Sequence, residues 1–240
     1  MRVPERSWRV VPWPILLLLA AALGTQMTWR AHQRQPQAVA AALPGPPTAS
    51  AMKVFSLGDT ALASRWLMLW LQAFDNQPGI SIAFRQLDYQ RVIGWLQLAL
   101  ELDPVNPYPL LAASHLYAEV NDPPRQREMI EFIRRAFSQA PDQRWAAMAH
   151  TVFLARHRLQ DKPLALALAG QLRAATDPSK VPGWARQMEI FVLEDIGEIE
   201  AARVMLGGLV ASGEVTDPGE LAFLQKRLAQ MQADDSGNSH

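Results

Sequence analysis

The sequence predicts an all-α fold, in which helical hairpins stack into an α-solenoid behind one amino-terminal transmembrane helix. Along the 240 residues, apolar side chains recur at helical spacing, and runs typical of β-strands are missing. Pairs of Asp and Pro punctuate the chain at intervals of 37, 37 and 40 residues, at Pro104, Pro141, Pro178 and Pro218. Such a period is typical of stacked helical hairpins.

The amino-terminal segment predicts a membrane anchor. Residues 1–13 are basic and contain Arg2, Arg6 and Arg9. Residues 14–30 carry no charge before Arg30 and are bracketed by Trp13 and Trp29, which resemble interfacial anchors. The two tryptophans are about 24 Å apart along a helix, which is short for a bilayer core of about 30 Å but sufficient with local thinning. We therefore expect a single-pass protein of the inner, cytoplasmic membrane, with its body outside the cytoplasm.

A cleaved signal peptide is the alternative interpretation of the same segment. Ala20 and Ala22 supply the small residues that a signal peptidase needs. The polar stretch that ends at Trp29 favours the anchor, because a removed peptide has no use for an interfacial tryptophan. Whether the segment is cleaved stays open at this point.

The rest of the chain divides into three parts by composition. Residues 31–52 are rich in Pro and Ala and predict a semi-rigid linker. Residues 53–232 form the predicted helical repeat domain. Residues 233–240 are small and polar and predict a flexible tail.

Within the repeat domain, apolar stripes predict which helix faces are buried. In residues 59–74 the stripe consists of Leu62, Trp66, Leu69, Trp70 and Ala73. In residues 89–102 it consists of Val92, Leu96, Ala99 and Leu100. Because this spacing lines one side of a helix, we expect both sets to face the core.

Residues 59–230 resemble tetratricopeptide repeats, in a degenerate form. Two segments have the spacing of the family's second helix: Val92, Leu96 and Ala99 before Pro104, and Met129, Ile133 and Ala136 before Pro141. First-helix positions are matched by Tyr108, Leu111 and Ala112. The carboxyl block adds Trp184, Met188, Phe191, the turn residue Gly197, Ala202 and Leu206. The resemblance implies stacked helix pairs with an extended inner surface that binds a partner.

Composition and motifs exclude several classes of function. Lys and Arg total 23, as do Asp and Glu, so no charge excess favours a nucleic-acid partner. The sequence contains no cysteine, which excludes disulfides, thiolate metal sites and thiol catalysis. No phosphate-binding loop, dinucleotide motif or hydrolase motif occurs. We therefore expect no cofactor and no enzymatic activity.

Two clusters contain residue types that occur in reaction centres, but neither predicts one. His150 and His157 lie on nearly one helix face and could bind a metal ion with an added carboxylate, but Arg156 and Arg158 would oppose the cation. An acidic cluster surrounds the turn at Gly197 and is expected to be solvated: Glu194, Asp195, Glu198 and Glu200. The sequence thus predicts no catalytic, cofactor or metal site.

The remaining prediction concerns partner binding. Polar residues on first helices are the best candidates for the inner surface, namely Tyr117, Arg144, His150, Arg186 and Glu189. The predicted function is a membrane-anchored scaffold that binds a protein or peptide during assembly of an envelope complex. Two alternatives remain: a permanent structural subunit of an integral membrane complex, and a glycan-acting hydrolase on a helical scaffold.

Overall fold

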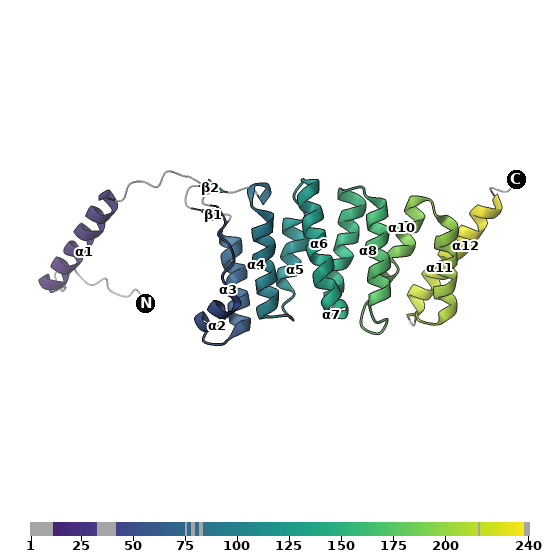
Figure 1. Ribbon diagram of the computed structural model, residues 1–240, viewed down its shortest axis with the longest axis horizontal. Helices are drawn as coiled ribbons and strands as arrows, with labels where there is room; N and C mark the ends of the chain where they lie inside the picture. The colour runs from purple at the N-terminus through teal and green to yellow at the C-terminus, as the bar shows by residue number, and fades with distance from the viewer. Residues whose placement is uncertain are drawn as a thin grey trace, which may run out of the picture. The chain divides into compact units, whose positions relative to one another are not determined.

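The structure is a computed structural model, and it describes residues 12–32, 42–74, 76–77, 80–81, 84–215 and 217–237. The chain divides into two units, of residues 1–41 with 78–80 and of residues 42–77 with 81–240. The described residues are predominantly α-helical, which confirms the predicted all-α class (Figure 1). Their other regular elements are short: β1 (Asn76–Gln77), β2 (Ile80–Ser81), the 3-10 turn η2 (Phe84–Gln86) and two π-turns.

Parts of the predicted organisation fall outside the described residues. They are the basic start with Arg2, Arg6 and Arg9, residues 33–41 of the predicted linker, and the last three residues of the predicted tail. The final helix, α12 (Pro218–Gly237), continues into the predicted tail, residues 233–240.

The first unit contains the helix α1 (Trp13–His32), which covers the predicted segment 14–30. Its strongly apolar part is confined to residues 15–23, and the second half contains the polar residues Thr25, Gln26 and Thr28. An apolar stretch of this length rises about 14 Å, less than half of a bilayer core of about 30 Å. Among the described residues, no helix is both long and apolar enough to cross a membrane. The prediction of a transmembrane span is therefore corrected: the helix forms, but its second half is too polar.

The linker was predicted over residues 31–52, but residues 42–52 belong to the helical unit. Leu43 is buried, and Trp95 Nε1 donates a hydrogen bond to Pro44 O at 2.9 Å. The first helix of this unit, α2 (Ala49–Phe55), also starts before the predicted boundary. Composition alone suited a spacer here, but contacts with distant residues hold the segment against the body.

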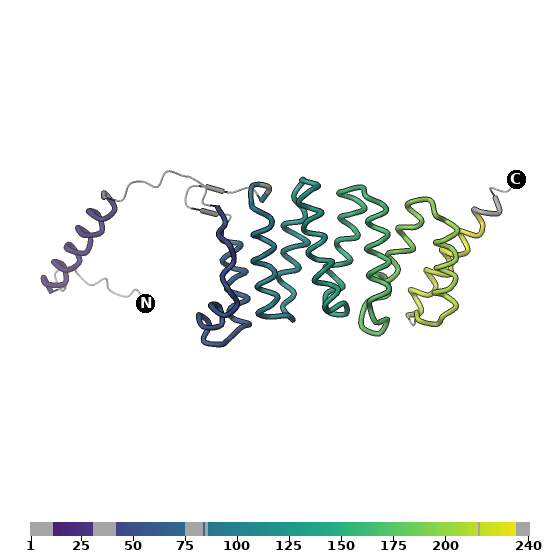
Figure 2. The backbone as a smooth tube through the Cα atoms, in the orientation of Figure 1, coloured from purple at the N-terminus to yellow at the C-terminus, as the bar shows by residue number. Residues whose placement is uncertain are grey.

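The helices of the second unit follow one another as hairpins, and the chain reverses direction between successive helices (Figure 2). The first helices are α3 (Thr60–Ala73), α5 (Tyr108–Ala112) with the π-turn η3 (Ala113–Tyr117), α7 (Pro141–Phe153) with the π-turn η4 (Leu154–Arg158), and α9 (Gly183–Arg186) with α10 (Met188–Ile196). The second helices are α4 (Tyr89–Leu102), α6 (Pro123–Gln139), α8 (Lys162–Ala175) and α11 (Ile199–Ser212). Each second helix contacts its own first helix and the first helix of the next hairpin, and α11 contacts α12.

Local signals explain where the hairpins begin and end. The punctuating prolines each follow the end of a second helix: Pro104, Pro141, Pro178 and Pro218. Asp88, Asp122 and Asp161 start α4, α6 and α8, because each side chain accepts hydrogen bonds from amides of the first turn. Gly197, with φ at +87°, ends α10 in the left-handed region that favours glycine. The predicted period thus corresponds to one helical hairpin.

The core confirms the second-helix stripes but not the stripe of α3. The second helices bury Val92, Leu96, Ala99, Met129, Ile133 and Ala136. In α3 the buried residues are Ala63, Ser64, Leu67, Met68 and Leu71. The predicted stripe is instead exposed at Leu62 (56%), Trp66 (41%) and Leu69 (65%). Since α3 is apolar on two faces, hydrophobic periodicity could not decide which face packs against α4.

Two consecutive first helices end in π-turns. The Ala118 amide donates to Ala113 O at 2.9 Å, and the Leu159 amide donates to Leu154 O at 3.0 Å. A π-turn holds one more residue than an α-turn, so the side chains that follow it lie on a different face than α-helical spacing predicts.

Candidate functional site

Five residues were predicted to bind a partner, and the structure places them in different surroundings: Tyr117, Arg144, His150, Arg186 and Glu189. Tyr117, at the end of η3, is fully buried, and its ring lies edge-on to Phe84 with 5.6 Å between centroids. The prediction that Tyr117 lies on the inner surface is therefore wrong. The tyrosine packs in the core, at helical spacing from the buried Leu110, Ala113 and Ser114.

Arg144 is also buried and belongs to the framework. Its Nη1 donates to Ala136 O at 2.7 Å and to Gln139 Oε1 at 3.1 Å, and its Nη2 donates to Pro104 O at 3.3 Å. Burial lowers the pKa of the guanidinium from its ordinary value. Arg144 thus ties α6 and the loop after α4 to α7, which gives it a structural role, and its role in partner binding stays a prediction.

His150 lies on α7 and stacks on His115 of η3, with 4.0 Å between ring centroids and 20° between ring planes. Its Nε2 is 3.4 Å from Glu119 Oε1, and Glu119 also pairs with Arg158 Nη2 at 2.8 Å. Burial lowers the pKa of His150, the neighbouring His115 lowers it further, and Glu119 opposes both effects. These effects together hold the pKa of His150 below its ordinary value, and the stack joins two consecutive hairpins.

We expect His150 to make folding stability depend on pH. Because its pKa is lower in the folded than in the unfolded chain, the unfolded chain takes up a proton first as the pH falls. This contribution to stability is complete above the ordinary histidine pKa of about 6.5 and is lost as the pH falls toward the folded pKa. Between about pH 7.5 and pH 5.5, the free energy of unfolding should therefore fall less in His150→Gln than in the unmodified protein. Urea denaturation at each pH measures this difference. The exposed His157→Gln is the control, and equal pH slopes in the two variants would contradict the assignment.

An exposed row of rings continues from the histidine stack. Phe153 is 45% exposed, and its ring centroid lies 5.8 Å from that of His150 and 4.6 Å from that of His157. Phe153 therefore lies between His150 and His157, the two histidines on nearly one helix face. In the described part of the chain, no group of three or more His, Cys, Asp or Glu side chains could hold a metal ion. We call His115, His150, Phe153 and His157 the aromatic row.

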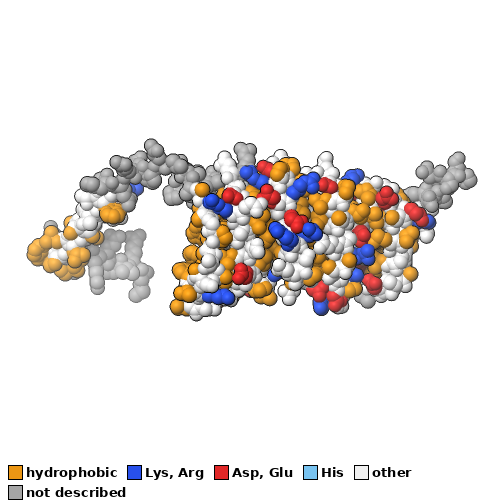
Figure 3. All heavy atoms as spheres, viewed as in Figure 1, with side chains coloured by type: hydrophobic (Ala, Val, Ile, Leu, Met, Phe, Trp, Pro, Cys, Tyr) orange, Lys and Arg blue, Asp and Glu red, His pale blue; other side chains and the backbone are white. Residues whose placement is uncertain are grey.

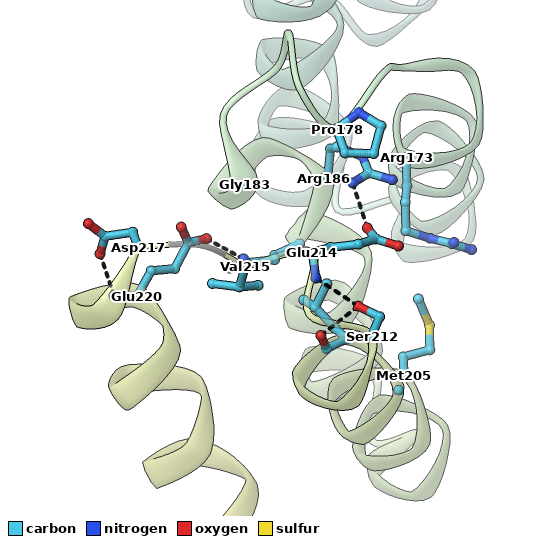
Figure 4. Close-up of a pocket in the computed structure, with 13 residues that line it drawn as sticks. Arg173, Pro178, Gly183, Arg186, Met205, Ser212, Glu214, Val215, Asp217 and Glu220 are labelled. Atoms are coloured by element: carbon cyan, nitrogen blue, oxygen red, sulfur yellow. Dashed lines mark hydrogen bonds and ion pairs between the residues drawn. The ribbon is translucent and has the colours of Figure 1, made fainter.

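Arg186 and Glu189 lie near a pocket of 370 Å³ at the carboxyl end of the body (Figure 4). Arg186 Nη1 pairs with Glu214 Oε2 at 3.0 Å across this pocket. Glu189 does not line the pocket, but it pairs at 2.5 Å with Nε of Arg173, which does. Apolar lining comes from Met205, Leu209 and Val215. The structure thus brings these two predicted residues together, with each guanidinium already held by a carboxylate.

No family model, curated protein or solved structure matches this chain. The resemblance to tetratricopeptide repeats therefore stays a prediction.

The acidic cluster around the α10–α11 turn lacks the properties of a catalytic acid. Three of its carboxylates form ion pairs at 2.5 to 3.0 Å: Glu194 with Arg227, Asp195 with Arg156, and Glu200 with Arg203. The hydrogen bond from Arg156 lowers the pKa of Asp195, and the one from Arg203 lowers that of Glu200. A general acid at neutral pH needs a raised pKa, so these shifts run in the wrong direction.

Sequence reasoning missed His115, Glu119 and Phe153 as neighbours of His150. A signal did exist for His115, because it precedes His150 by about one hairpin and equivalent positions of stacked hairpins lie side by side. Glu119 had no comparable signal. It follows η3, and the sequence pattern did not reveal the π-turn that places it beside the next hairpin.

Proposed function

We propose that the protein is a scaffold that binds another protein through the aromatic row, and that it is not an enzyme. The observation that carries this proposal is the row itself, which runs from η3 across α7 to η4 and leaves Phe153 exposed. Exposed rings with few rotatable bonds supply large apolar contact areas at a small loss of side-chain entropy. Such residues contribute most of the binding energy in many protein interfaces.

The surroundings of the row define the chemistry of the partner. A pocket of 100 Å³ beside His115 is lined mainly by small and apolar side chains, among them Leu110, Leu111 and Ala147. On the other side, Glu119 and Arg158 form an ion pair. A peptide segment with one apolar side chain and a flanking charge would complement these features.

The packing of the helices supports an α-solenoid of the tetratricopeptide-like type as the scaffold. Each second helix contacts the helices before and after it, as in a linear stack of hairpins. The residues that carry the resemblance in two of the second helices, including Met129, Ile133 and Ala136, are buried. A linear stack places equivalent first-helix positions in a row, which is the arrangement that His115 and His150 have.

We also propose that the amino-terminal segment directs the body out of the cytoplasm. Residues 15–23 have the length of the apolar region of a signal peptide, arginines precede them, and Ala20 and Ala22 provide a peptidase site. The intact mass of the protein recovered from its host should correspond to a chain that begins near Leu23. A full-length chain in the cytoplasmic fraction would contradict this proposal.

Site-specific photo-crosslinking tests the binding surface. A photo-reactive phenylalanine analogue at Phe153 should yield a covalent adduct with one other polypeptide in the native host. The same analogue at Phe223 is the matched control, because Phe223 is similarly exposed but lies on α12. No adduct at position 153, or equal adducts at both positions, would show that the aromatic row is not the binding surface.

A further inference from the structure

The amino-terminal end of the helical body carries a large exposed apolar surface (Figure 3). It consists of six side chains on α2, the following turn and α3: Val54, Phe55, Leu57, Leu62, Trp66 and Leu69. The rings of Phe55 and Trp66 lie 5.1 Å apart and join the two helices into one surface, which we call the amino-terminal patch. Leu57 is 97% exposed and has a φ of +53°, a strained conformation for leucine.

The α3 part of the amino-terminal patch has the spacing of a helix-packing seam. Leu62, Trp66 and Leu69 are separated by four and three residues, as in the a and d positions of a coiled coil. The other first helices each pack against the second helix of the preceding hairpin, whereas α3 is preceded in the body by α2 alone. Among the described residues of the body, the neighbour that this face lacks is therefore another helix.

The opposite end of the body differs in character. Around its buried residues Leu224 and Met231, α12 exposes side chains that are mostly small or polar: Ala222, Phe223, Gln225, Lys226, Ala229 and Gln230. In a repeat array, such a surface is typical of a terminal cap. Head-to-tail stacking of copies would bury these polar groups against the amino-terminal patch, whereas head-to-head pairing would bury the patch against itself.

We propose that the occupant of the amino-terminal patch is a second copy of this chain, related by a two-fold axis near the α3 helices. The exposed fractions of the six side chains correspond to on the order of 800 Å² per chain, which is the area that each partner contributes to a stable interface of standard size. A monomer rarely exposes so large an apolar surface without a binding role. The dimer leaves the aromatic row free, so it does not depend on the proposed function.

The oligomeric state of the full chain tests the proposal. Sedimentation velocity at micromolar concentration should give twice the mass of one chain, which is 26.7 kDa for the uncleaved sequence. Leu69→Glu should raise the dissociation constant at least about 100-fold, because the dimer would bury an unpaired charge. Phe223→Glu on α12 is the matched control and should remain a dimer. A one-chain mass for the unmodified protein, or equal dissociation in both variants, would overturn the proposal.

Disulfide trapping provides a second measurement that does not require a charged substitution. Since the chain contains no cysteine, Leu62→Cys, Trp66→Cys and Leu69→Cys each introduce a single thiol. A disulfide across a two-fold axis requires the two copies of a residue to lie within about 7 Å between Cα atoms. Under mild oxidation, at least one of the three should give a covalent dimer, while Phe223→Cys should not. Failure of all three would overturn the head-to-head arrangement.

Discussion

Ala202→Trp should lower the free energy of unfolding by at least about 2 kcal/mol. Ala202 is fully buried on α11, in a cluster with Ile190, Leu193, Leu206 and Leu224. At this position α11 packs against α10, so an indole ring forces the helices apart or forces neighbouring side chains off their rotamers. Urea denaturation monitored by circular dichroism measures the difference.

Ala201→Trp is the matched control for this substitution. Ala201 is the adjacent residue on α11 and has the same side chain, but it is exposed. Its replacement should change the free energy of unfolding by less than about 0.5 kcal/mol. Similar losses at the two positions would mean that the packing face of α11 is assigned incorrectly.

Arg144→Met should lower the free energy of unfolding by about 3 kcal/mol. Methionine fills a similar length but leaves three acceptors without their donor, namely Ala136 O, Gln139 Oε1 and Pro104 O. The carbonyl of Ala136 contributes most of this loss, because it is buried and accepts the shortest of the three hydrogen bonds from the guanidinium. The measurement is again urea denaturation. Crosslinking to the partner from position 153 should be retained in this variant.

Arg135→Met provides the comparison for Arg144. Arg135 is exposed on α6, and its Nε is 4.0 Å from Glu131, so its loss should change stability by less than about 0.5 kcal/mol. If Arg144→Met instead left stability unchanged and abolished crosslinking, the original interpretation of Arg144 as a binding residue would be correct.

Three of the sequence predictions for the site failed or were incomplete for identifiable reasons. Polarity on a first helix indicated Arg144, but a polar side chain can satisfy buried carbonyls as well as a partner. Polarity likewise indicated Tyr117, but its ring is fully buried and packs edge-on to Phe84. His150 was indicated without its stacked neighbour His115, which lies in the preceding hairpin.

The helical class and the hairpin boundaries follow from the amino-acid sequence alone. Capping by Asp88 and Asp122, the proline at Pro141 and the left-handed Gly197 all act within one helical turn, so their effect can be predicted from neighbouring residues. The buried stripes of the second helices could also be predicted, because those helices combine apolar and polar residues in a periodic pattern.

Contacts between helices, in contrast, set which face of α3 is buried, where Tyr117 points and how His150 meets His115. An apolar residue is favourable against any apolar neighbour, so a helix such as α3, with apolar residues on two faces, has no preferred side until the adjacent helix is in place. The polar residues in the second half of α1 can be recognised in the sequence as unfavourable for a membrane span. The span was predicted nevertheless, because Trp13 and Trp29 resemble interfacial anchors. Local chemistry thus sets where each helix starts and stops, whereas contacts between helices far apart in the sequence set which side chains remain exposed for binding.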